Sequence, residues 1–347
     1  MIVFTLPVGI WVQYAIHPLH LLFTPVAVFG FIPALDWYFG QDLRNPDPVE
    51  EERLSEVKLY RYIVWASAFL VLALVIWGAY IATRPGTGPL TYVLLALAIG
   101  INSGALGINM SHELIHRVNS RIEPALGRMI LMTVFYMHWA IEHVAGHHRW
   151  VATPGDPATA RLGQSFYSFW PQTVFGSFRS AWDIERGILK RRGKKVWGPS
   201  NRVLRYMAIQ VGFVLALAVA FGPLAIPFYF MQAFVAVTLL ESVNYMEHYG
   251  LERKQLEDGS YEKVRPEHSW TQSSRVTNLY LVNLQRHSDH HYDPRRRYQI
   301  LRHYEDSPQL PAGYAAMVPI TLVPPLWRKV MDKRVPASSA ANGGENR

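Results

Sequence analysis

Eight of the 14 histidines lie in three short windows of the sequence. The first window, His112-Glu113-Leu114-Ile115-His116, places two imidazoles four residues apart, which on a helix is one face. The other windows repeat this spacing with one more histidine each: His143, His147 and His148, and then His287, His290 and His291. Imidazoles with few carboxylates suit iron, zinc, copper or nickel, and so many ligands exceed the roughly four to six that saturate one ion. The pattern therefore predicts two metal ions held by histidine.

A ninth ligand is predicted from its position. His248 stands alone in the segment Asn244–Gly250, but it follows the last apolar stretch and so emerges at the membrane surface. His138 precedes His143 by five residues and is off the i, i+4 register with it, so we expect a structural or supporting role. The remaining histidines are expected to be structural or surface residues: His17, His20, His268 and His303.

Four acidic residues stand beside the predicted ligands: Glu113, Glu142, Glu247 and Asp289. They can orient imidazole N–H groups and offset the charge of two dications. They can equally lie on solvated helix faces, and the sequence leaves both alternatives open.

The first window also has the form H-E-x-x-H, in which two histidines bind zinc and the glutamate is the general base of a protease. Such a protease needs only one further ligand. It would leave the other two windows unexplained, so we favour a two-metal centre.

The chain has no cysteine, which excludes disulfides, iron–sulfur clusters and thiolate ligands. Any sulfur-based electron carrier must therefore belong to another protein. The net charge is +8, but the basic residues lie mainly between apolar stretches. This distribution indicates membrane topology and an acidic partner, and not nucleic acid.

Apolar stretches long enough to cross a bilayer must position these ligands. Five are predicted, each close to the roughly 20 residues that a bilayer requires: Leu21–Phe39, Tyr60–Ala82, Leu90–Met110, Tyr206–Ile226 and Pro227–Tyr245. Met1–Ile16 is a sixth, shorter candidate without the marks of a signal peptide. The predicted fold is an all-α polytopic membrane protein with about six transmembrane helices in three hairpins.

The loop from Arg179 to Arg205 contains nine Lys or Arg and two acids, which assigns it to the cytoplasm. Each hairpin returns the chain to that side, so His112 and His248 should both reach the cytoplasmic face. The apolar stretch Leu126–Ala140 is interpreted as an interfacial or cytosol-facing helix, because a single crossing there would separate the histidine windows.

The organisation follows from these assignments. Two N-terminal hairpins (1–110) precede cytoplasmic-face helices with the first two windows (111–203), the third hairpin (204–247) and a cytoplasmic cap with His248 and the third window (248–335). The tail 336–347 is predicted to be disordered.

Motifs around the histidines match a known family. They include Gly40-Gln41-Asp42, Val151–Pro157, Arg265–Trp270 and the run Leu284–His291. On these residues the sequence resembles the integral-membrane alkane monooxygenases, relatives of xylene monooxygenase and of membrane fatty-acid hydroxylases and desaturases. The resemblance covers most of the chain.

The resemblance implies a non-haem centre of two iron ions (Fe²⁺/Fe³⁺) that uses O₂ to hydroxylate the terminal methyl group of medium-chain n-alkanes. Electrons would come from rubredoxin, reduced by its reductase, and an acidic rubredoxin suits the basic run Arg295–Arg297 after the third window. The enzyme would lie in the bacterial inner membrane among its lipids, with the metals on the cytoplasmic side.

Two alternatives remain open. A related hydroxylase or desaturase would act on xylene-type, terpene or fatty-acyl substrates. A histidine-rich metal transporter would need ionisable residues along the spans, yet Asp36 and Glu241 lie near span ends.

Overall fold

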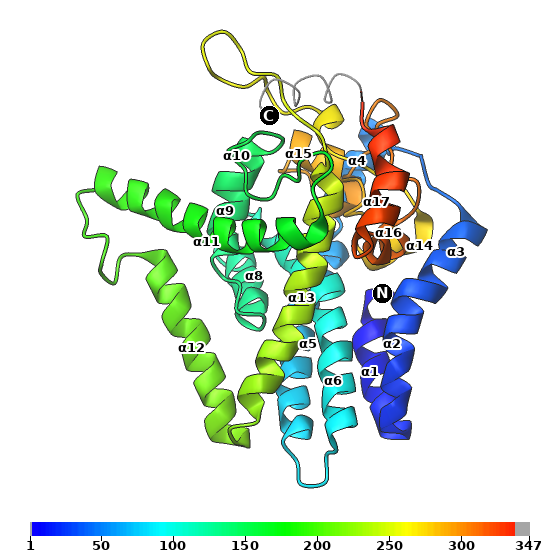
Figure 1. Ribbon diagram of the computed structural model, residues 1–347, viewed down its shortest axis with the longest axis vertical. Coiled ribbons are helices and arrows are strands. Elements are labelled where there is room, and N and C mark those ends of the chain that lie inside the picture. The colour runs from blue at the N-terminus through cyan, green and yellow to red at the C-terminus, as the bar shows by residue number, and fades with distance from the viewer. Residues whose placement is uncertain (1, 337–347) are drawn as a thin grey trace. The chain divides into compact units, whose positions relative to one another are not determined.

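The computed structural model describes residues 2–336, which are mostly helical (Figure 1). Within residues 2–336 there are only isolated β-bridges and no strand. Five helices are long and apolar enough to cross a membrane: Pro18–Phe39, Lys58–Ala82, Pro89–Ile115, Arg202–Phe221 and Ala225–His248. The predicted all-α polytopic membrane fold is therefore confirmed. Ile2–Ile16 is shorter, so the sixth span stays a prediction, and most of the tail predicted to be disordered (337–347) lies outside the described residues.

The chain divides into two compact units. Unit 1 contains the residues up to Val28, Lys58–Glu142 and Ala181–Leu240. Its helices are α1 (Thr5–Ile16), α2 (Phe23–Val26), α5 (Lys58–Ala82), α6 (Pro89–Asn102), α7 (Asn109–Ile115), α8 (Glu123–Met132), α9 (Trp139–Glu142) and α12 (Arg202–Phe221), with the first part of α13 (Ala225–His248) and the last part of α11 (Phe166–Arg191).

Unit 2 contains Phe29–Val57, His143–Ser180 and the residues from Glu241 onward. Its helices are α3 (Ile32–Phe39), α4 (Pro48–Glu56), α10 (His148–Trp150), α14 (Arg275–Tyr280), α15 (His287–Tyr292), α16 (Tyr314–Thr321) and α17 (Pro324–Met331). Short π-helical segments occur at Ala27–Phe31, Ser103–Ile108 and His143–His147.

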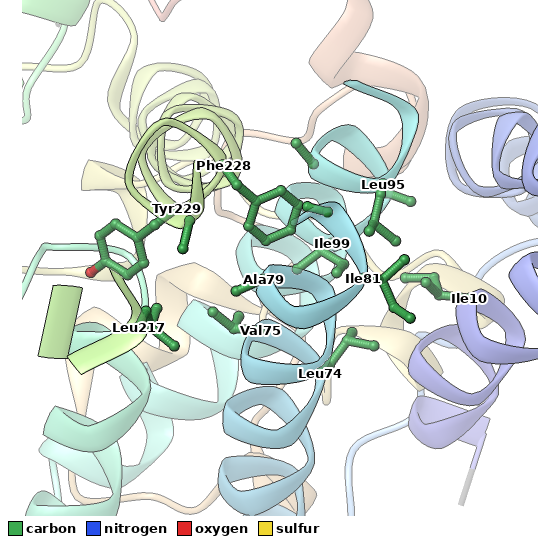
Figure 2. Packing of buried hydrophobic residues seen from close by; sticks show 14 of the residues in the cluster. Ile10, Leu74, Val75, Ala79, Ile81, Leu95, Ile99, Leu217, Phe228 and Tyr229 are labelled. Atoms are coloured by element: carbon green, nitrogen blue, oxygen red, sulfur yellow. The ribbon is translucent and has the colours of Figure 1, made fainter. Parts of the chain in front are cut away.

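The core of unit 1 is a close-packed set of apolar helices. Figure 2 shows side chains of α5, α6 and α13, such as Leu74, Ile99 and Phe228, meeting between the helices. Gly78 on α5 permits this approach, because a Cβ there would lie 2.2 Å from Ile99 and 2.8 Å from Phe228. With 25 residues at about 1.5 Å each, α5 exceeds the roughly 30 Å of a hydrocarbon core.

The stretch predicted as one helix over Leu126–Ala140 is broken. α8 ends at Met132, too short to cross a bilayer, and α9 begins at Trp139. Polar side chains of the neighbouring spans bond the backbone of the break: Gln210 accepts from the Met137 N–H at 2.7 Å, and Gln232 donates to the Thr133 carbonyl at 2.7 Å. These bonds compensate for the helical hydrogen bonds lost at the break.

The boundary between the last two spans also differs from the prediction. α12 ends at Phe221, because Gly222 adopts φ +99°, and α13 begins at Ala225. Pro227 therefore lies inside the first turn of α13, where a proline is tolerated.

Candidate metal centre

Three predicted ligands of unit 2 converge through their Nε2 atoms. The Nε2 of His148 lies 3.2 Å from that of His143 and 3.1 Å from that of His290. His143 begins the π-helical segment, His148 begins α10, and His290 comes from α15. We call these residues the three-histidine group.

Four further predicted ligands of unit 2 form a second group. Their ligand nitrogens lie within 4.8 Å of one another, and all four residues are buried: His147, His248, His287 and His291. The Nε2 atoms of His248 and His287 are 3.3 Å apart. We call these residues the four-histidine group.

The nitrogen spacings fit metal coordination. Two imidazole nitrogens bound to one ion at about 2.0–2.1 Å lie roughly 2.8–3.4 Å apart for bond angles between 90° and tetrahedral. The three Nε2 distances, 3.1, 3.2 and 3.3 Å, fall in this range. Both ring nitrogens of His291 are buried without a hydrogen-bond partner among the described residues. Because an unsatisfied buried nitrogen is costly, a cation that accepts its lone pair suits this site.

The helix type decides which ligands share a group. In α15, an α-helix, His287 and His291 are four residues apart and belong to the same group, as the sequence spacing predicts. His143–His147 is π-helical, so its turn holds one residue more, and His143 is joined by His148 instead of His147. The extra residue directs His147 to the four-histidine group.

His147 is oriented by Asp156, a carboxylate that is not among the four predicted acids. Asp156 Oδ2 lies 2.9 Å from His147 Nδ1, and both side chains are buried. Burial alone would raise the pKa of the Asp156 carboxyl, but the His147 ring and a hydrogen bond from Thr159 bring its pKa below the ordinary value. An ionised carboxylate can only accept, so the ring proton resides on Nδ1 and its lone pair on Nε2. This is the arrangement in which a carboxylate supports a metal-binding histidine.

Glu247, one of the four predicted acids, approaches a second ligand. Its Oε1 lies 3.2 Å from His287 Nδ1 and accepts a hydrogen bond from the Tyr314 hydroxyl at 2.8 Å. Asp289 instead accepts from Arg296 at 3.0 Å and from the backbone N–H of Arg302 at 2.8 Å. Asp289 therefore anchors the loop after α15 and orients no imidazole among these contacts.

The third window is held in place from its N-terminal side. Arg286 donates to the carbonyls of Leu301 at 2.6 Å and of Asp42 at 2.8 Å. Asn45 pairs with His303 through both its side-chain oxygen and its side-chain nitrogen. The motif around Gly40-Gln41-Asp42 thus supports the loop behind the metal ligands.

Unit 1 contains the first window. His112 and His116 lie at the end of α7 with ring centroids 5.0 Å apart. Glu113 accepts two hydrogen bonds from Arg117, at 3.1 and 2.8 Å, so it forms a buried ion pair. All four predicted acids are buried, Glu142 included, which excludes the solvated-face alternative.

The other histidines stand outside both groups. Burial lowers the pKa of His138 to about 3, and its ring packs against Tyr136 at 4.4 Å. His268 Nε2 lies 3.2 Å from Glu262, and His303 Nδ1 lies 3.1 Å from the Ser273 hydroxyl. His17 and His20 are exposed.

The basic run after α15 divides into two kinds of residue. The side chain of Arg296 is 20% exposed and binds Asp289, which stands next to the ligand His290. The side chain of Arg295 is 90% exposed and pairs with Asp293 at 3.0 Å. Arg295 is therefore the residue that a partner protein can reach without disturbing the centre.

Comparison with known proteins indicates the class to which this chain belongs. The family model described as fatty acid desaturase matches residues 87–321. Alkane 1-monooxygenase 2 of Pseudomonas aeruginosa is 44% identical over 315 residues, which are 89% of this chain and 82% of the relative. Alkane 1-monooxygenase 1 of the same organism is 42% identical over 342 residues, 97% of this chain and 89% of the relative. Alkane 1-monooxygenase of Acinetobacter baylyi is 40% identical over 326 residues, which are 93% of this chain and 79% of the relative.

Five apolar helices, buried histidine groups and the family match define a membrane oxidoreductase of the fatty acid desaturase class. Within that class, the extent and level of identity show that the chain belongs to the alkane 1-monooxygenase family. Membership of an enzyme family excludes the metal-transporter alternative.

Proposed function

We propose that this protein hydroxylates the terminal methyl group of medium-chain n-alkanes at a centre of two iron ions. The reaction consumes one O₂, two electrons and two protons, and it yields a primary alcohol and water. We assign the supply of electrons to rubredoxin, as the family resemblance implies. This chain contains no cysteine for an iron–sulfur centre of its own. The convergence of seven histidines into two groups in unit 2 is the single structural observation that carries the proposal.

We assign the ligands as nine histidines: His112, His116, His143, His147, His148, His248, His287, His290 and His291. The nitrogen spacings in unit 2 support seven of them. The spacing of the first window and the hairpin count support His112 and His116. When bound, the two ions supply the means to activate O₂ for attack on an unactivated C–H bond.

The protein's own residues prepare the site for this chemistry. Seven of the nine assigned ligands are buried, which limits the access of water and protects a strongly oxidising centre from side reactions. Asp156 fixes the orientation of the His147 ring, and Asp156 and Glu247 lie close enough to the ligands to offset the charge of the ions. A substrate dissolved in the bilayer suits an enzyme with five apolar spans. We place the enzyme in the inner membrane with its metals on the cytoplasmic side, from the basic loop that precedes α12.

Product analysis tests the activity. Purified protein with rubredoxin, its reductase and ¹⁸O₂ is supplied separately with octane through hexadecane, xylene and fatty acids, and products are identified by gas chromatography and mass spectrometry. We expect ¹⁸O-labelled 1-alkanols, and none from a His291→Ala control. Conversion of xylene or acyl chains with alkanes untouched would contradict the substrate and leave the family unchanged.

A further inference from the structure

The chain passes from α11 to α12 in unit 1 through a short loop (Figure 1). A cavity of about 380 Å³ opens beside this loop. Its polar lining consists of Arg192, Lys194, Ser200, Arg202, Arg205 and Glu185. Gly193, at φ +63°, ends α11 and lets the chain turn back, with the Lys194 N–H bonded to the Leu189 carbonyl at 2.9 Å. The turn brings residues from both sides of the loop to one cavity.

The cavity is strongly basic, with four cationic side chains against a single carboxylate. Glu185 is already bound to Arg202, with Oε2 2.7 Å from the guanidinium and Oε1 accepting from the Arg202 N–H at 2.9 Å. Burial alone would raise the pKa of Glu185, but the hydrogen bonds from Arg202 bring it below the ordinary value. The carboxylate thus neutralises one cation, and a net excess of positive charge faces the cavity.

The backbone N–H groups at the N-terminus of α12 are not free to bind an anion in this cavity. Asn201 caps the helix by accepting from the Val203 N–H at 2.9 Å and the Leu204 N–H at 3.3 Å. Glu185 accepts from the N–H before them. The backbone donors are therefore satisfied, and an anion in the cavity is bound by side chains such as those of Arg192 and Lys194, which are exposed.

The place of the cavity on the molecule indicates the kind of anion. α12 is one of the membrane spans, and its apolar side chains point outward, with Leu215 55% and Val219 88% exposed. At the polar end of this lipid-facing helix, Trp197 is 76% exposed and its ring lies 4.8 Å from that of Trp182. An exposed tryptophan beside basic residues is typical of the headgroup level of a bilayer.

We propose that this cavity binds the phosphate headgroup of an anionic phospholipid whose acyl chains lie along α12. The basic side chains contact the phosphate, and the Ser200 hydroxyl is available to donate to its oxygens. A neutral zwitterionic lipid has no net charge to match the excess of cations, so the site favours the anionic lipid.

The test measures binding of phosphatidylglycerol with a fluorophore on its acyl chain to the detergent-solubilised full chain, by anisotropy. In Arg192→Gln with Lys194→Gln, the apparent Kd should rise about thirtyfold, as expected for two basic contacts to a headgroup. The matched control is Lys190→Gln with Lys195→Gln, which removes the same charge from the same segment but from outside the cavity lining. Its apparent Kd should change little.

Three results would overturn the proposal. Equal weakening in both double variants would mean diffuse attraction to a basic loop, and no weakening in either would mean that the cavity does not bind the lipid. Displacement of the labelled lipid by millimolar inorganic phosphate as readily as by unlabelled phosphatidylglycerol would mean a site for free phosphate. We expect unlabelled phosphatidylglycerol alone to compete, and phosphatidylcholine not to. Because the altered side chains are exposed, circular dichroism should show the same helical content in all variants.

Discussion

Replacing Asp156 with asparagine keeps the size of the side chain and removes its charge. Oδ2 of Asp156 faces His147 Nδ1 at 2.9 Å, and Oδ1 accepts from the Ala158 N–H at 3.0 Å. An asparagine must turn its NH₂ toward one of these two donors, so one buried mismatch is unavoidable. The wrong tautomer of His147 then competes with metal binding. We expect the affinity of the four-histidine group for its ion to fall about 10- to 100-fold, the usual effect of losing such a carboxylate.

Iron content measured against a series of ferrous-chelator concentrations gives this affinity. Asp156→Asn should release one iron at about 10- to 100-fold less chelator than the unaltered protein, while the other iron stays bound. Glu257→Gln, which removes a charge from an exposed loop position, is the control and should behave as the unaltered protein. If Asp156→Asn released both irons only at the chelator concentrations that the unaltered protein requires, the role given to Asp156 would be refuted.

Three further predictions concern stability and electron transfer. Tyr314→Phe removes a hydrogen bond to the buried Glu247 and should lower the free energy of unfolding by about 1–3 kcal/mol, measured by thermal denaturation in detergent; an unchanged transition would contradict this. A Cβ at Gly100 would lie 2.7 Å from a backbone oxygen of α13, so Gly100→Ala should cost about 1–3 kcal/mol. Gly212→Ala, with open space at its Cβ, should be tolerated within about 1 kcal/mol, and equal effects at the two glycines would be inconsistent with the packing. Rubredoxin-driven turnover should fall as salt rises, and Arg295→Glu should lower it with iron content unchanged; turnover indifferent to both would remove Arg295 as a docking residue.

The sequence predicted the parts of this protein that local patterns determine. Apolar stretches set the five spans to within a few residues, because a bilayer imposes their length. The histidine windows supplied six of the seven predicted ligands that unit 2 brings together, because each window is a run within a turn or two of helix. The seventh, His248, was predicted from its position after the last apolar stretch. The end of α12 was placed too late, since Gly222 stops the helix inside a continuous apolar stretch.

Features that depend on tertiary structure were not predictable in the same way. The π-helical turn His143–His147 has no distinctive local composition, yet it determines that His143 shares a group with His148. Asp156 lies nine positions after His147, beyond α10 and a turn, so spacing gave no sign of their contact. Its position between a glycine and a proline, inside the motif Val151–Pro157, was the available signal.

An experimental structure of the iron-loaded protein, with anomalous scattering at the iron edge, tests the two-iron centre most directly. We predict two iron peaks, with a ring nitrogen of each of the nine assigned histidines within about 2.0–2.3 Å of one of them. More than two of these histidines lying beyond about 3 Å from both metals, or a single iron peak, would contradict the assignment.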